Sequence, residues 1–80
     1  ESEYADFINQ EKREVSIPKE LQTVLKNEQD AFKFFNSLSF SNKKEYIIWI
    51  LSAKQEKTKQ ERLEKTVEKL KHQKKNPSEK

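Results

Sequence analysis

A run of six apolar residues, Tyr46-Ile47-Ile48-Trp49-Ile50-Leu51, is the feature that most restricts how this chain can fold. Ser39 and Ser41 precede it, and both are candidate N-caps for a helix. A helix built on this run is apolar nearly all round, so neighbouring elements must cover it from several sides. We therefore expect a central helix within a packed domain.

Two shorter helices are predicted before this run. Pro18 is tolerated in a first helical turn, and apolar residues at i, i+3 and i+4 after it predict a helix over about 18–26. Asn27 followed by Asp30 is an N-terminal capping pattern, which predicts a second helix ending near Leu38.

The C-terminal segment predicts a separate last helix. Its apolar stripe is out of register with that of the central helix by about a quarter turn, so one straight helix could not bury both stripes against one partner. Thr58 and Glu61 match a capping box, and the last helix is predicted from about 58 to 73.

The predicted fold is all-α, a small bundle of about four short helices with flexible termini. Residues 1–15 show mixed spacing and are assigned to a linker or tail, 16–73 to the helical domain, and the charged 74–80 to a disordered tail. The predicted core consists of Leu21, Leu25, Phe32, Phe35, Tyr46, Ile47, Trp49, Ile50, Leu63, Val67 and Leu70.

Composition excludes several classes of site. The 80 residues contain no Gly, so no glycine-rich phosphate loop is present, and no Cys, so disulfides, thiol nucleophiles and cysteine-bearing zinc sites are excluded. The one histidine, His72, stands among lysines that would oppose a bound cation. We therefore expect no cofactor, no metal and no catalytic residue, and we predict that the chain is not an enzyme.

The net charge of +3 conceals an asymmetry, because residues 1–40 hold five Lys/Arg against eight Asp/Glu and residues 41–80 hold twelve against six. In the last helix Lys59, Arg62, Lys65 and Lys69 form a candidate interaction surface that could follow a phosphate backbone. Three glutamates interleave with these cations and weaken the field. A solvated helix face is the favoured interpretation, and nucleic-acid binding is the alternative.

The aromatic residues can be interpreted either as core residues or as contacts for a partner. Trp49 is the only Trp and is expected in the core, although an anchor for a partner is the alternative. Phe32, Phe34 and Phe35 cannot all face one side of one helix. One of them is therefore expected at the surface or against another element, which hints at a docking surface.

The segment from Val15 to Leu70 resembles the YdeI/OmpD-associated family, which is named in connection with bacteriocin protection. The resemblance is carried by Ile17-Pro18-Lys19-Glu20-Leu21 followed by Leu25, Ala31-Phe32 and Phe35 leading to Leu38, Ser39-Phe40-Ser41-Asn42-Lys43-Lys44-Glu45-Tyr46, Trp49-Ile50, Ala53-Lys54, Thr58-Lys59 and Arg62-Leu63-Glu64-Lys65.

The resemblance implies a compact helical domain, often the C-terminal part of a longer bacterial protein. This chain departs from the family pattern at Lys59 and Glu61, where the family tends to have Arg, and at Glu56, near which it has Pro. The family's usual Gly after the last helix is replaced by His72-Gln73-Lys74. The Lys59 and Glu61 changes weaken any anion-binding role of this corner, because Lys lacks a bidentate fork and Glu reverses the charge.

The favoured function is a non-enzymatic protein-interaction or appended structural module of a bacterial cytoplasmic protein, linked to bacteriocin or envelope-stress protection. The alternative is a nucleic-acid-binding helical domain that uses the basic C-terminal half. The expected partner is a protein or a neighbouring domain of the parent chain. No stretch approaches 18 apolar residues and no signal peptide is visible, so no membrane span is expected. The chain lacks an initiator Met, and we expect it to be processed or a fragment.

Overall fold

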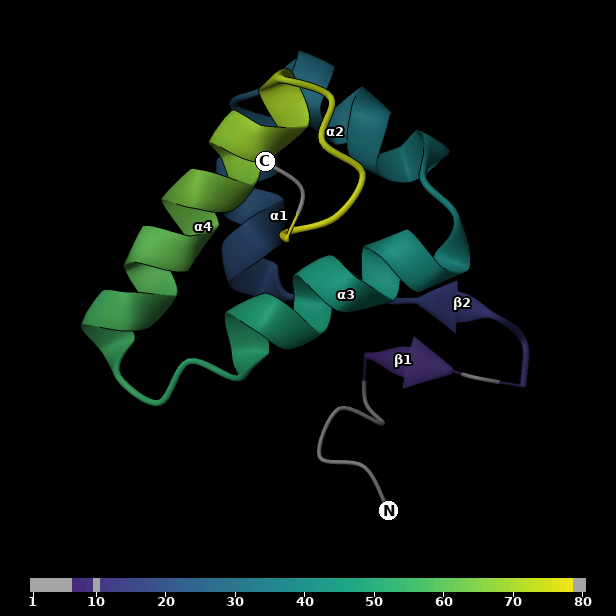
Figure 1. Ribbon diagram of the computed structural model, residues 1–80, viewed down its shortest axis with the longest axis horizontal. Helices are drawn as coiled ribbons and strands as arrows, with labels where there is room; N and C mark the ends of the chain where they lie inside the picture. Colours follow the sequence, from purple (N-terminus) through teal and green to yellow (C-terminus); the bar gives the residue numbers. More distant parts are fainter. Residues whose placement is uncertain (1–6, 10, 79–80) are drawn as a thin grey trace.

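The computed structural model describes residues 7–9 and 11–78, which form four helices and a small β-hairpin (Figure 1). Along the chain the elements are β1 (Ile8–Asn9), β2 (Glu14–Val15), α1 (Lys19–Lys26), α2 (Gln29–Ser37), α3 (Phe40–Leu51) and α4 (Glu56–Lys71). The predicted bundle of four helices is present. The all-α prediction is wrong in one respect, because a two-stranded sheet precedes the helices.

The hairpin occupies part of the range that we assigned to a linker or tail. β1 and β2 pair antiparallel with Ile8 opposite Val15 and Asn9 opposite Glu14. The backbone N–H of Ser16 donates to the carbonyl of Phe7 over 2.7 Å and extends the ladder. Ile8 is buried, so docking of its side chain on the helices stabilises strands that are too short to persist alone. Residues 1–6 and 10 of the predicted tail lie outside the described residues.

Of the four helices in the described part of the chain, only α3 has a side-chain hydrogen bond at its N-cap. There the hydroxyl of Ser39, one of the two predicted caps, accepts the backbone N–H of Asn42 over 3.3 Å. Asn27 does not cap α2 as predicted. It ends α1 as its C-cap, and Glu28 takes the N-cap position of α2 without a side-chain hydrogen bond. Asn27 fits there because its side-chain amide reaches back to the Thr23 carbonyl at 3.5 Å.

The predicted break between the third and fourth helices is confirmed, because α3 ends at Leu51 and α4 begins at Glu56. The predicted capping box is wrong. Gln55 is the N-cap of α4, and Thr58 lies inside the first turn, where its hydroxyl cannot cap the helix. The chain is extended at Gln55, which turns α4 away from α3 and lets each helix bury its own stripe.

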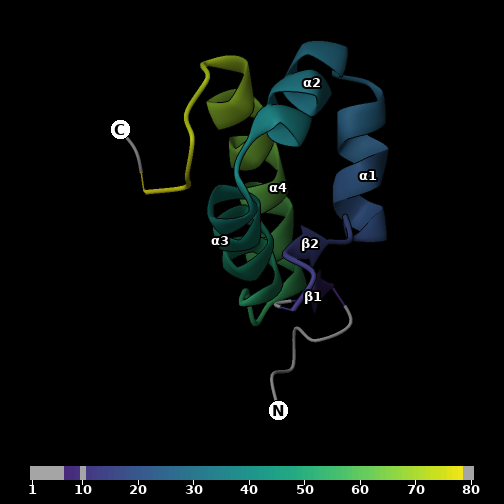
Figure 2. The same ribbon diagram turned by 90° about the vertical axis from the view of Figure 1, so that its right-hand side faces the viewer.

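The central helix is α4, not α3 as predicted. α4 contacts α1, α2 and α3, and Figure 2 shows it between α1 and α3. α3 packs on α4 and on β2, and this leaves Ile48, Trp49 and Leu51 half-buried. α4 contacts all three other helices although its sequence is largely charged, because its few buried residues, Leu63, Thr66 and Leu70, lie toward them.

The buried core is close to the predicted set. Of the predicted residues, Leu21, Leu25, Phe35, Tyr46, Ile47, Ile50, Leu63 and Leu70 are buried. Phe32, Trp49 and Val67 are only half-buried and pack against the edge of the core, because each lies at the margin of its helix's inward face. Buried positions outside the prediction are Ile8, Pro18, Ala31, Leu38 and Thr66.

The chain after α4 is partly held by the core, although 74–80 were predicted as a disordered tail. Gln73 adopts a left-handed φ of 60°, and the N–H groups of Gln73 and Lys74 donate to the carbonyls of Leu70 and Lys69. The buried hydroxyl of Tyr46 then donates to the Lys74 carbonyl over 2.6 Å. Residues 79–80 lie outside the described residues.

Candidate functional site

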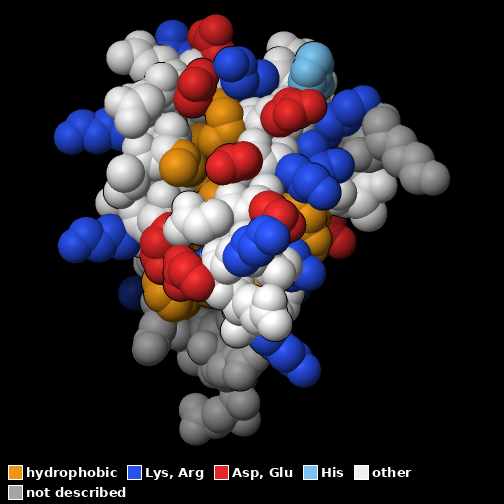
Figure 3. All heavy atoms as spheres, turned by 90° about the vertical axis from the view of Figure 1, so that its left-hand side faces the viewer, with side chains coloured by type: hydrophobic (Ala, Val, Ile, Leu, Met, Phe, Trp, Pro, Cys, Tyr) orange, Lys and Arg blue, Asp and Glu red, His pale blue; other side chains and the backbone are white. Residues whose placement is uncertain are grey.

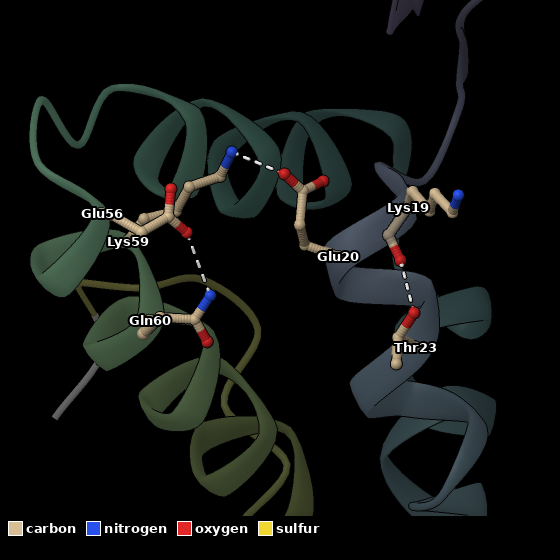
Figure 4. A network of polar contacts seen from close by, with 6 residues as sticks. All are labelled: Lys19, Glu20, Thr23, Glu56, Lys59 and Gln60. Atoms are coloured by element: carbon tan, nitrogen blue, oxygen red, sulfur yellow. Dashed lines mark hydrogen bonds and ion pairs between the residues drawn. The ribbon is translucent and has the colours of Figure 1, made fainter.

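Lys59, the first cation of the predicted interaction surface, is used by the fold. Its ammonium lies 2.7 Å from the Glu20 carboxylate and so links α4 to α1 (Figure 4). The Lys59 side chain is 22% exposed. The hydrogen bond from Lys59, reinforced by a backbone hydrogen bond within Glu20, lowers the pKa of Glu20 below its usual value. This pair ties two helices together and leaves little of Lys59 for a ligand.

Arg62, the second cation, secures the C-terminus of α3. Its Nη1 donates to the Trp49 carbonyl over 2.6 Å and to the Ser52 hydroxyl over 3.0 Å. Its guanidinium carbon lies 5.5 Å from the centre of the Trp49 ring. α3 has no basic residue in its own last turn, so Arg62 supplies the positive charge that a helix C-terminus favours. Arg62 is thus a structural residue.

The other two cations of the surface differ from each other. Lys65 is exposed, whereas Lys69 is half-buried and engaged in a further interaction. Figure 3 shows acidic and basic side chains interspersed over the face on the α4 side. The four predicted cations therefore do not make one continuous basic surface.

A groove that the sequence did not predict lies between the hairpin and the start of α3, and we call it the hairpin groove. Its volume is about 470 Å³. Figure 1 shows the hairpin beside the N-terminal half of α3. The groove is lined by Phe7, Ile8, Asn9, Arg13, Glu14, Val15, Ser16, Phe40 and Lys43.

Phe40 is the aromatic centre of this region. The guanidinium carbon of Arg13 lies 5.3 Å from the centre of its ring, and the ammonium of Lys44 lies 5.6 Å from it. Both distances are within the range of cation–π attraction. The sequence signal for this region is weak, because Val15 and Ile17 stand at strand spacing but over so few residues that spacing does not identify a hairpin.

The remaining predicted features carry little chemistry. His72 is exposed and is the C-cap of α4. Within the described residues, no group of three or more metal-ligating side chains comes together. Phe32 and Phe34 are both half-buried, and each lines a shallow hollow of its own, so they do not combine into one docking surface. Phe35, the third of the group, is buried against Tyr46.

Comparison with known proteins identifies the family. The profile of the family described as "Bacteriocin-protection, YdeI or OmpD-Associated" matches residues 14–73, which run from β2 through all four helices. The chain belongs to this family. No curated protein and no solved structure matched the chain. Within the described residues, none of the helices of this family member has the length and apolar character needed to cross a bilayer.

The matched range divides the hairpin groove between shared and individual parts. Glu14, Val15, Ser16, Phe40 and Lys43 lie inside the range of the YdeI/OmpD-associated profile, whereas Phe7, Ile8, Asn9 and Arg13 precede it. The α3 wall and the β2 part of the hairpin wall thus lie within the family domain, whereas β1 and Arg13 precede it.

Proposed function

We propose that this chain is a non-enzymatic protein-interaction module of a bacterial cytoplasmic protein and that the hairpin groove is its contact surface. The family name supports a link to bacteriocin or envelope-stress protection. The observation that carries the proposal is a groove whose lining combines two half-buried aromatic residues, Phe7 and Phe40, with charged residues. Aromatic residues and Arg, both present in this lining, are enriched in protein contact surfaces.

The size and openness of the groove suit a short peptide segment. A volume of about 470 Å³ accommodates a few side chains. Phe7 and Phe40 offer apolar contact, and the carbonyl and N–H groups of the hairpin lie beside them. Arg and Phe are both enriched in interface cores, where they supply much of the binding energy.

A non-enzymatic role fits the use of the polar residues. The carboxyl of Glu20, whose pKa is lowered, is held by Lys59 in a contact between two helices. Thr66, the buried hydroxyl of α4, donates to the Arg62 carbonyl over 2.7 Å within its own helix. Both groups are engaged in contacts that hold the fold together.

The alternative, nucleic-acid binding through α4, is weakened by the contacts of Lys59 and Arg62. A duplex that neutralised all four cations would have to break the Lys59–Glu20 pair and withdraw Arg62 from Trp49. We expect no saturable micromolar binding of a labelled duplex at physiological salt. A complex whose affinity falls with salt at a log–log slope of about −0.9 per phosphate, and is lost in Lys65→Gln, would support the alternative.

The proposed function is tested by selecting peptides from a displayed random library on the folded domain. We expect enriched peptides that compete with one another and that perturb the amide signals of Phe40 and Val15 in an NMR titration. Phe40→Leu keeps an apolar side chain but removes the ring, and it should weaken these peptides. Lys57→Gln, on the exposed face of α4, is the matched control and should not. Absence of any peptide that binds in the groove would contradict the proposal.

A further inference from the structure

We propose that the segment taken by the hairpin groove is acidic, with carboxylates flanking one apolar side chain. This inference rests on the proposed function and adds the chemistry of the partner. Two cations, Arg13 and Lys43, line the groove, and Lys44 stands beside Phe40 at its edge. A ligand in the groove therefore meets positive charge around an aromatic ring.

These three cations are not neutralised by the described part of the protein. The ion pairs within residues 7–9 and 11–78 join Lys59 to Glu20 and Lys71 to Glu28. None of the described carboxylates is paired with Arg13, Lys43 or Lys44. Lys59 and Arg62 on α4 are used by the fold, whereas Arg13 and Lys43 line a groove and have no ion-pair partner among the described residues.

The positions of Lys43 and Lys44 also favour an acidic partner. Both lie near the beginning of α3, which has no acidic residue in its first turn. A helix is stabilised by negative charge in its first turn, and Lys43, the fourth residue of α3, brings positive charge to the end of that turn. Residues that oppose local stability are expected where a function requires them. A carboxylate of the partner beside these lysines would relieve the repulsion.

The groove fits an acidic peptide better than a nucleic acid. Glu14 also lines it, and its carboxylate would repel an unbroken row of phosphates. A peptide can instead place its carboxylates next to Arg13 and Lys43 and its apolar side chain over Phe40, because its charges are spaced by neutral backbone. Electrostatic complementarity of this kind selects the partner and speeds the encounter.

The test uses a short labelled peptide in which aspartates flank one phenylalanine, measured by fluorescence anisotropy on the whole chain. Its neutral counterpart carries asparagines in place of the aspartates. We expect the acidic peptide to bind roughly tenfold more tightly than the neutral one. The variant Arg13→Gln/Lys43→Gln should abolish this difference, and added salt should reduce it.

The matched control is Lys57→Gln/Lys65→Gln, which removes the same charge from exposed positions of α4. It should retain the preference for the acidic peptide to within about twofold. Circular dichroism checks that both variants keep the helical content. Lys43→Gln alone should lose part of the preference and provides a second, milder variant.

Failure of this inference differs from failure of the proposed function. If library-selected peptides occupy the groove but bind equally well after Arg13→Gln/Lys43→Gln, or are not enriched in Asp and Glu, the acidic partner is wrong and the peptide groove stands. If no peptide enters the groove, the proposed function fails as well. Binding of single-stranded DNA or of anionic lipid vesicles at Arg13 and Lys43, in preference to the acidic peptide, would also overturn the inference.

Discussion

Replacement of Arg62 by Ala should destabilise the domain by about 2 kcal/mol. The side chain makes a charged hydrogen bond to the Trp49 carbonyl, and such bonds contribute about 1.5–3 kcal/mol. Its contact with the Trp49 ring adds about 0.5–1 kcal/mol. The hydroxyl of Ser52 also donates to the Trp49 carbonyl over 3.0 Å, so this carbonyl keeps a partner and the total falls toward the lower end of the range.

Urea unfolding measures this loss, followed by circular dichroism and by the fluorescence of Trp49, which is the only Trp and touches Arg62. In a domain of this size, 2 kcal/mol corresponds to a fall in Tm of roughly 8–16 °C. Arg62→Lys keeps the charge but not the planar fork, and it should lose about half as much. Lys65→Ala, one turn along α4, is the control and should stay within about 0.5 kcal/mol of the parent.

The reasoning would be refuted if Arg62→Ala and Lys65→Ala unfolded at the same urea concentration as the parent protein. In that case Arg62 would be a surface cation, and it would be available to bind a ligand as part of the basic surface of α4. A large loss in Arg62→Ala with no change in Trp49 fluorescence would also contradict the proposed contact, because the guanidinium would then act elsewhere.

Three further outcomes are expected. Gln73→Gly should raise the free energy of unfolding by up to about 1 kcal/mol, measured by thermal unfolding, because Gln73 has a left-handed φ that Gly adopts without steric cost; a destabilised variant would contradict this. Tyr46→Phe should cost about 1 kcal/mol and increase amide exchange beyond α4, since the hydrogen bond from the Tyr46 hydroxyl to the Lys74 carbonyl is removed; unchanged exchange there would be evidence against the link. The pKa of Glu20 is lowered by Lys59, so its contribution to stability is present above the unfolded-state pKa and is lost as the pH falls through the folded-state pKa. Glu20→Gln should therefore flatten the acid limb of the stability curve, by no more than about 1 kcal/mol because the pair is at the surface, and an identical pH profile would exclude the effect.

The helices could be predicted from the sequence because apolar spacing decides which face is buried. Leu21 and Leu25 in α1, and Leu63 and Leu70 in α4, are buried as their spacing indicates. Thr66 was missed because Thr is counted as polar. Its hydroxyl is satisfied by the Arg62 carbonyl of the same helix, so burial leaves no polar group without a partner.

The hairpin could not be predicted with the same rule. Each strand has two residues, and a period of two cannot be recognised over so short a stretch. Its stability comes from the docking of Ile8 and Val15 on the helices, which is a tertiary effect. The turn carries little sequence signal: the Asn9 side chain accepts the backbone N–H of Lys12 over 3.0 Å, but Arg13, not Gly or Asn, holds the left-handed φ of 54°.

The candidate site shows the same limit. Periodicity places Lys59, Arg62, Lys65 and Lys69 on related faces of α4, but it does not reveal that Glu20 and Trp49 lie opposite two of them. Lys59 and Glu20 are 39 positions apart in the chain. Helical periodicity describes only the helix itself, whereas whether a cation is available to a ligand depends on what the neighbouring helices bring to it.

The cations of this domain therefore fall into two groups, those held by groups of a neighbouring helix and those without such a partner. On α4, Arg62 faces the open C-terminal end of α3, where carbonyl groups and an aromatic ring hold it in place. At the N-terminal end of α3, Lys43 lies at the end of the first turn, where a helix favours negative charge. At the C-terminal end of α3, Arg62 supplies the positive charge that this end of a helix favours. At the N-terminal end, no acidic residue in the first turn supplies the negative charge that is favoured there. A partner that brings carboxylates to the hairpin groove would supply negative charge at the N-terminal end of α3, just as Arg62 supplies positive charge at its C-terminal end.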